Sequence, residues 1–264
     1  MSDFLQTMAH ASRERAEAMK TRVPPSELRA MADDAVKSLT LDRFDLIAEV
    51  KRSSPSAGVL ENPGLDVVVQ ARQYAQAGAA LISVLTEPTR FGGSAEDLCA
   101  IARETGAPVM RKDFLVDPYQ IAEARAWGAS AVLLIARLLE NDMLSAMLDA
   151  ASEFELTVLL EAFDERDIER SVAAIRGRTG VLLGLNCRDL ETLHEDAARF
   201  EALIDTFPEG SIKIAESGIA SPEDAHRVAR LGYDGVLVGT SLMRSSDAGR
   251  LAREIIDAGR AARA

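Results

Sequence analysis

The stretch SPEDAHRVARLGYDGVLVGT, residues 221–240, contains the alternation of helix and strand that decides the fold. Ser221 is a typical N-cap, and the Pro222 that follows it favours the first turn of a helix. Gly232 is expected to end that helix, since glycine readily adopts the backbone conformation that closes one. The apolar run at 235–240 then predicts a buried strand. A helix that leads directly into a strand is the unit from which parallel sheets are built.

The same unit recurs along the chain. The segment DPYQIAEARAWG repeats the helix signals with Asp117, Pro118 and Gly128, and Gly78 and Gly106 are placed to close two more helices. Short β-rich apolar runs, each expected to be a strand, occur at 45–51, 80–86, 108–113, 131–136, 157–163, 181–186, 211–217 and 235–240. These runs are nearly continuous rather than alternating, which is typical of strands covered on both faces.

Repetition of this unit through a chain of 264 residues predicts a closed (β/α)8 barrel, the TIM-barrel fold. The alternative is an open, doubly wound sheet, but no G-x-G-x-x-G follows the first run and the composition does not change between the halves. We expect one domain over residues 1–264. Residues 1–44 form its N-terminal helical extension, with ASRERAEAMK and PPSELRAMADDAVKSL as helices that cap the barrel floor or lean over its mouth.

Composition and charge exclude several classes of function. A net charge of -12 argues against nucleic acid as a partner, and any anion site must be a local cationic pocket. Cys99 and Cys187 match no zinc or redox spacing, so we expect no metal and a reduced, cytoplasmic compartment. The start MSDFLQTMAH lacks the layout of a signal peptide. No apolar run approaches the ~20 residues that span a bilayer, so no membrane partner is expected.

Polar side chains gather where the predicted strands end, which in this architecture is the end that carries the active site. They are Glu49, Lys51, Lys112, Asp113, Glu161, Asn186, Arg188, Glu216, Ser217 and Gly218. Glu49 and Lys51 are two positions apart and therefore face the same side of the sheet. Any one strand-end lysine is more often just solvated, but the set as a whole predicts a ligand site. Asp113 could instead face the helices, and Glu216 could only pair with a lysine.

Two turns suggest a phosphate site, and one loop suggests a lid. AESGIASPED and VLVGTSLMRSSD follow the seventh and eighth runs, where barrels commonly bind phosphate through backbone amides. The alternative is that both are ordinary tight turns. The loop TEPTRFGGS, residues 86–94, contains Phe91 and is either a mobile lid or a plain surface loop.

Histidine is absent from the predicted strand ends. His10, His194 and His226 lie in expected helices or loops, which favours surface roles. No Ser-His-Asp or Cys-His set is visible. Acid–base chemistry is therefore expected from lysine and glutamate, and the cysteines are expected to be packing residues.

Taken together, these segments resemble the indole-3-glycerol-phosphate synthase family. The matching stretches are IAEVKRSSPSAG, SVLTEPTRFGGS, VMRKDFLVDPYQIAEARAWGASAVLLI, LLEAFDE, GLNCRDL, IAESGI and VLVGTSLM, and they run through nearly the whole chain. The resemblance implies the ring-closing step of tryptophan synthesis. The substrate would be 1-(2-carboxyphenylamino)-1-deoxyribulose 5-phosphate, and the products indole-3-glycerol phosphate, carbon dioxide and water, with no cofactor.

The resemblance also implies roles for individual residues. Lys112 would be the general acid and Glu161 a base or proton relay, while Glu49 and Lys51 would orient the substrate. The implied substrate contacts are Ser54, Pro55, Ser56, Phe114, Asn186, Arg188, Glu216 and Ser217. The implied phosphate contacts are Lys51, Gly218, Gly239 and Thr240. We expect a neighbouring cation, together with partial burial, to lower the pKa of Lys112 toward the working pH. The division of roles between Lys51, Lys112 and Glu161 is left open.

Two other functions remain as alternatives. One is a different phosphosugar barrel, such as an isomerase with an Asp or Cys acid and base. The other is a non-catalytic barrel that binds phosphorylated metabolites or a protein. Cys187, Thr240 and Ala57 depart from residues common in the family, but no proposed catalytic group is missing. The expected partner is a small phosphorylated molecule, and the expected assembly is a monomer or a weak homo-oligomer.

Overall fold

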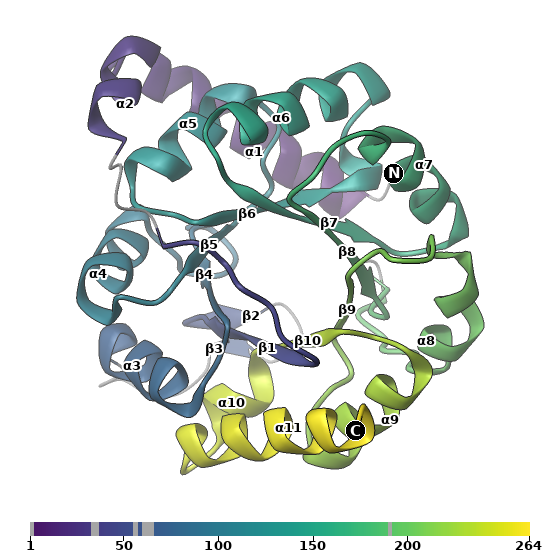
Figure 1. The fold of residues 1–264 in the computed structure, drawn as a ribbon. Coiled ribbons are helices and arrows are strands. Elements are labelled where there is room, and N and C mark those ends of the chain that lie inside the picture. Colours follow the sequence, from purple (N-terminus) through teal and green to yellow (C-terminus); the bar gives the residue numbers. More distant parts are fainter. Residues whose placement is uncertain (1–2, 33–36, 55–57, 60–65, 190–191) are drawn as a thin grey trace.

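The computed structural model describes residues 3–32, 37–54, 58–59, 66–189 and 192–264. Its centre is a closed barrel of parallel strands in the order β1-β10-β9-β8-β7-β6-β5-β4 (Figure 1). The barrel strands are β1 (Asp45–Val50), β4 (Leu81–Leu85), β5 (Val109–Lys112), β6 (Ala131–Ile135), β7 (Thr157–Ala162), β8 (Val181–Asn186), β9 (Lys213–Glu216) and β10 (Gly235–Val238). The predicted (β/α)8 barrel is confirmed. The open sheet is excluded because β1 pairs with both β4 and β10.

Helices surround the barrel and connect its strands (Figure 1). They are α3 (Val67–Ala77), α4 (Ala95–Thr105), α5 (Pro118–Ala126), α6 (Asn141–Glu153), α7 (Glu165–Ile175), α8 (Ala198–Leu203), α9 (Pro222–Leu231), α10 (Thr240–Arg244) and α11 (Ala248–Ala262). Short elements complete the connections, namely the hairpin strands β2 (Ser53–Ser54) and β3 (Gly58–Val59) and the 3-10 turns η1 (Ala136–Leu138) and η2 (Ile204–Thr206). β1, β4, β6 and β10 are buried along their whole length, as expected for strands covered on both faces.

The end signals of the sequence position the helices as expected. The side chains of Ser221 and Asp117 each accept a backbone N–H of the first helical turn and complete a capping box. Gly78, Gly106 and Gly232 all close their helices in the left-handed conformation. Each of these three helices therefore ends just before the next strand begins, which sets the position of the last side chain of that strand.

The N-terminal extension leans toward the mouth of the barrel rather than its floor. It contains α1 (Asp3–Lys20) and α2 (Pro25–Met31), and α1 lies against α5 (Figure 1). Phe4 of α1 packs edge-on against Phe114, which follows the C-terminal end of β5. The second helix is shorter than predicted, since residues 37–39 are not helical. Only Leu28 of α2 is buried, so little packing supports a longer helix.

The length and the polarity of the helices bear on whether any of them could cross a membrane. In the described part of the chain, no helix combines the length and the apolar character needed to cross a bilayer.

Candidate active site

A cavity of about 630 Å³ opens at the C-terminal ends of the barrel strands. That volume is typical of a site for a small molecule. Of the residues predicted from sequence, the cavity is lined by Glu49, Lys51, Lys112, Asp113, Phe114, Glu161, Asn186, Arg188, Glu216, Ser217, Gly218, Gly239 and Thr240. Ser54 lies in β2, and Pro55 and Ser56 lie outside the described residues. The structure therefore brings together side chains from β1, β5, β7, β8, β9 and β10.

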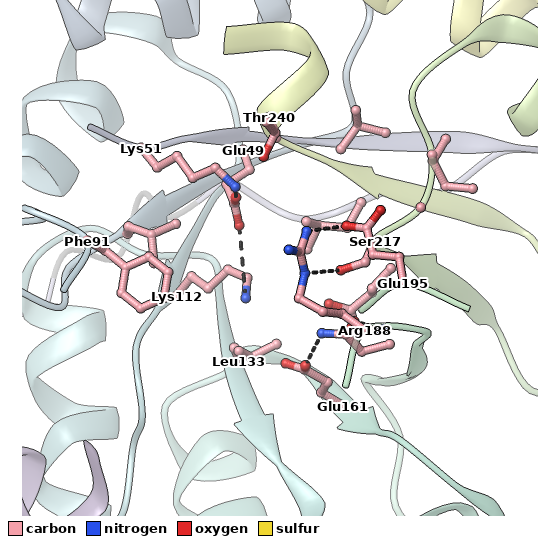
Figure 2. A pocket seen from close by; sticks show the side chains of 18 of the residues that line it. Glu49, Lys51, Phe91, Lys112, Leu133, Glu161, Arg188, Glu195, Ser217 and Thr240 are labelled. Carbon is pink, nitrogen blue, oxygen red and sulfur yellow. Dashed lines mark hydrogen bonds and ion pairs between the residues drawn. The ribbon is translucent and has the colours of Figure 1, made fainter. Parts of the chain in front are cut away.

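An ion pair from the end of β1 forms one wall of the cavity (Figure 2). The Lys51 Nζ lies 2.7 Å from Glu49 Oε1, and the Lys112 Nζ lies 3.9 Å from Glu49 Oε2. Burial alone would raise the pKa of Glu49, but Lys51 and Lys112 outweigh it and lower that pKa below its ordinary value. A Cβ at Gly239 would come within 2.3 Å of Glu49 Oε1, so this ion pair itself requires glycine at the start of α10.

The expectation of a lowered pKa for Lys112 is wrong. Burial favours the neutral amine, but the carboxylates of Glu161, Glu49 and Glu216 together outweigh both burial and Arg188 and raise the pKa above 10.5. The side chain of Lys112 is 18% exposed. Its ammonium group therefore points into the cavity as a stable cation, held charged by the acids around it.

Glu161 and Asn186, on the neighbouring strands β7 and β8, form a second polar pair. The Asn186 Nδ2 donates to Glu161 Oε1 at 2.6 Å. The other carboxylate oxygen, Oε2, is buried and has no hydrogen-bond partner. Glu161 is thus oriented through one oxygen, while the second oxygen remains available to accept a proton.

Glu216, at the end of β9, is buried without any hydrogen bond to its carboxyl oxygens. The possibility that it merely pairs with a lysine is not realised among the described residues, because no ion pair to it is formed. Burial, with the charge of Glu161 adding to it, raises the pKa of Glu216 well above 4.5. A Cβ at Gly184 of β8 would come within 2.0 Å of Glu216 Oε1, so that glycine makes room for the carboxyl group. Gly184 was not predicted from the sequence.

Arg188 follows β8 and is held from three sides. Its backbone N–H donates to Asn186 Oδ1 at 3.0 Å, and its Nε donates to the Ser217 hydroxyl at 3.5 Å. Its Nη2 contacts the carboxylate of Glu195, which also forms an isolated antiparallel bridge with it (Figure 2). These contacts place a guanidinium group at the cavity opposite Glu49 and Lys51.

The turn after β9 has an unusual backbone. Ser217 and Gly218 both have positive φ values, +66° and +63°. A Cβ at residue 218 would lie 2.9 Å from Cys187 Sγ, so both conformation and space favour glycine there. Successive residues of this kind direct backbone N–H groups into a concavity suited to anions. Burial raises the pKa of Cys187 to about 12, which keeps it an inert thiol, as expected of a packing residue.

The loop with Phe91 is organised around one buried carboxylate. Glu87 accepts hydrogen bonds from the backbone N–H groups of Thr89, Arg90 and Phe91 at 2.9, 2.7 and 3.2 Å. This network holds the loop as a compact turn and brings the Phe91 ring to the cavity, where it packs against Phe114. The structure therefore favours a fixed wall over a freely mobile lid.

Several lining residues were not found from sequence. They are Phe4, Leu133, Ile135, Leu193, His194, Glu195, Leu237, Ser241 and Arg244. His194 is exposed in a loop, as expected, and it also borders the cavity. Phe4 and His194 come from an N-terminal helix and a long loop, whose places in space no strand-end rule gives. Within the described ranges, no group of His, Cys, Asp or Glu side chains is arranged to hold a metal ion.

Comparisons with known proteins agree with this geometry. The sequence model of the family described as "Indole-3-glycerol phosphate synthase" matches residues 5–255. The indole-3-glycerol phosphate synthase of Beutenbergia cavernae is 41% identical over 250 residues, which cover 94% of this chain and 91% of that protein. The protein of the same name from a Nocardioides species is 47% identical over 204 residues, which cover 76% of each chain.

Among solved structures, 3-hexulose-6-phosphate synthase from Salmonella typhimurium has a TM-score of 0.66 and covers 82% of this chain and 99% of that one. Its sequence identity is only 16%, so that likeness shows the barrel fold alone. The family, by contrast, is established by sequence along almost the whole barrel. With its cavity built from the matching segments, this chain belongs to the indole-3-glycerol phosphate synthase family.

Proposed function

We propose that this protein converts 1-(2-carboxyphenylamino)-1-deoxyribulose 5-phosphate to indole-3-glycerol phosphate, carbon dioxide and water, a carboxy-lyase step of tryptophan synthesis. The observation that carries the proposal is the convergence of Lys112, Glu161 and Glu216 around one cavity at the carboxyl ends of their strands. This set provides both a proton donor, Lys112, and a proton acceptor, Glu161, within a single site. The name of the family supports indole-3-glycerol phosphate as the product.

Lys112 acts first, as the general acid. As the ring carbon that bears the carboxylate attacks the ribulose carbonyl carbon, the new C–C bond forms and the carbonyl oxygen takes a proton from the ammonium group. Carbon dioxide then leaves, and the electron pair of the broken bond to the carboxylate carbon returns to the ring. The raised pKa makes each ammonium a weak acid but keeps nearly every Lys112 protonated. The positive charge also stabilises the developing alkoxide before the proton transfers.

Glu161 serves the later dehydration. Its Oε2 has no hydrogen-bond partner, so it can take the proton from the carbon adjacent to nitrogen. The hydroxyl group takes a second proton from Lys112, which has been reprotonated from solvent, and leaves as water. The hydrogen bond from Asn186 fixes the direction of this carboxylate. The neutral form of Glu216, favoured by its raised pKa, donates a hydrogen bond to a substrate oxygen and so orients the ribulose chain.

Binding groups occupy two sides of the mouth. We assign the phosphate to the turns at Gly218, Gly239 and Thr240, with Lys51 beside them, because left-handed backbone and a close cation suit an anion. We assign the ring and its carboxylate to Arg188, Asn186 and Phe114. The resemblance adds Ser54, Pro55 and Ser56, of which Pro55 and Ser56 lie outside the described residues. Anchoring both ends removes much of the entropic cost of bringing ring and carbonyl together.

The alternative of an isomerase with an Asp or Cys acid and base fits less well. The carboxylate of Asp113 is engaged by Arg15 and Thr86, and Cys187 is an inert thiol. The test is to incubate the protein with the carboxyphenylamino substrate and follow indole fluorescence and carbon dioxide release. Equal amounts of both products support the proposal. An isomerised phosphosugar without carbon dioxide, or binding without turnover, would contradict it.

A further inference from the structure

Glu195 is a cavity residue for which the proposed reaction has no task. It lies between β8 and α8, lines the cavity, and directs its carboxylate to Arg188 (Figure 2). Its side chain is 37% exposed and that of Arg188 is 19% exposed. The antiparallel bridge between the two residues holds their backbones in register, so the contact is part of the local fold.

The geometry of the guanidinium group means that this contact affects how Arg188 can bind a ligand. On one edge of Arg188, the protein already uses both donors, since Nε donates to Ser217 and Nη2 meets Glu195. The remaining edge consists of Nη1 and the same Nη2. Nη2 carries two N–H groups, one on each edge, so a ligand carboxylate can still bind Nη1 and Nη2 in the usual two-pronged manner. It then shares the single positive charge of Arg188 with the Glu195 carboxylate, and the two carboxylates repel each other.

We propose that Glu195 is a specificity-determining residue that competes with the substrate carboxylate for Arg188. This inference rests on the proposed function, which assigns that carboxylate to Arg188. Glu195 weakens binding of ligands that bring a carboxylate to Arg188 and has less effect on the phosphate, because Lys51 and Gly239 follow β1 and β10 rather than β8. The product has lost the carboxylate, so the competition acts on substrate and not on product.

The test compares two ligands on Glu195→Gln, which keeps the side-chain length and removes the charge. The first ligand is the substrate with its ribulose carbonyl reduced to an alcohol, which carries both anionic groups and cannot cyclise. The second is indole-3-glycerol phosphate, which carries the phosphate alone. By calorimetry, we expect Glu195→Gln to bind the first about fivefold more tightly, as for a partly exposed ion pair, and the second within about twofold of wild type.

The matched control is Glu201→Gln on α8, an exposed residue outside the cavity lining, which changes net charge equally. In steady state, Glu195→Gln should lower KM with kcat nearly unchanged. Equal tightening of both ligands, or the same change in Glu201→Gln, would show a general charge effect and overturn the proposal. Weaker binding of the reduced substrate would make Glu195 a support for Arg188 instead. Failure of the proposed function is distinct, because wild-type protein would then release no carbon dioxide and form no indole from the unreduced substrate, whatever the two variants bind.

Discussion

Two groups of buried charges lie on opposite sides of the same strand, β5. The inner cluster, Glu49, Lys112, Glu161 and Glu216, lines the cavity. The outer cluster, Arg15, Arg111, Asp113 and Glu123, is joined by ion pairs between β5 and helices α1 and α5, and its Asp113 also borders the cavity. Lys112 belongs to the first, whereas its neighbours Arg111 and Asp113 belong to the second, because successive strand side chains point to opposite faces.

The two clusters differ in how their charges are compensated. In the outer cluster, every carboxylate meets a guanidinium, with Arg15 at 2.7 Å from Asp113 and Arg111 at 3.2 Å from Glu123. Arg111 also lies over the Trp127 ring at 4.2 Å. In the inner cluster, Glu216 has no hydrogen-bond partner. An unpaired buried carboxyl group costs folding free energy, and such groups are commonly retained where a ligand or a reaction uses them.

The largest expected effect comes from removing the cation of the inner cluster. Lys112→Ala should lower kcat by about 10²- to 10⁴-fold, the usual contribution of a general acid, while the affinity for indole-3-glycerol phosphate changes little. Stopped-flow or steady-state indole fluorescence, with calorimetry for binding, measures both. Lys213→Ala is the matched control, because Lys213 begins β9 at the opposite end of the barrel. Turnover near that of wild type in Lys112→Ala would remove Lys112 from the acid role.

The outer cluster should respond in stability instead. Arg15→Ala removes the nearer of two guanidinium groups from the buried Asp113 carboxylate and leaves Arg111 at 3.6 Å, so we expect it to lower the free energy of unfolding by about 2 kcal/mol. Urea titration followed by circular dichroism measures this change, and a single transition is expected if residues 1–264 form one domain. Arg13→Ala, at an exposed position of the same helix, should change little. If Arg15→Ala lowered turnover a hundredfold while the free energy of unfolding stayed constant, the claim that the outer cluster serves stability and the inner cluster serves turnover would be contradicted.

Glu216 should reveal the stability cost of the inner cluster through pH. Its pKa is raised in the folded protein, so its neutral form is favoured there, and its contribution to stability falls as pH rises above 4.5 through the raised pKa. Relative to wild type, Glu216→Gln should therefore gain stability with increasing pH, by at most about 1.4 kcal/mol per unit within that window. Urea titrations from pH 5 to 8 test this, and a difference that is constant with pH would contradict it. Turnover should fall in the same variant.

The sequence allowed the barrel and most of the lining to be predicted, for one physical reason. Parallel strands bring their carboxyl ends to one rim, so residues such as Lys112 and Glu161 could be placed together without knowledge of any contact. The pKa of Lys112 could not be predicted, since it depends on how many carboxylates surround it. The contact between Glu195 and Arg188 could not be predicted either, because it depends on the path of a loop. The ending of α2 at Met31 likewise reflects the packing that it lacks.

The smallest expected effect tests whether burial of an ion pair, and not pairing alone, sets its contribution to the free energy of unfolding. Lys20 Nζ lies 2.6 Å from Asp117 Oδ2 and joins α1 to the cap of α5, much as Arg15 joins α1 to β5. The hydrogen bond to Asp117, with that to Glu17, raises the pKa of Lys20, so the pair contributes below pH 10.5 and is lost as pH rises through the raised value. Because its side chain is 32% exposed, Lys20→Ala should cost no more than ~1 kcal/mol at pH 7, and less in 1 M salt. Urea titrations at both salt concentrations measure this cost. If Lys20→Ala lowered the free energy of unfolding as much as Arg15→Ala, and the loss were the same in 1 M salt, then exposure would not explain the difference between the two ion pairs.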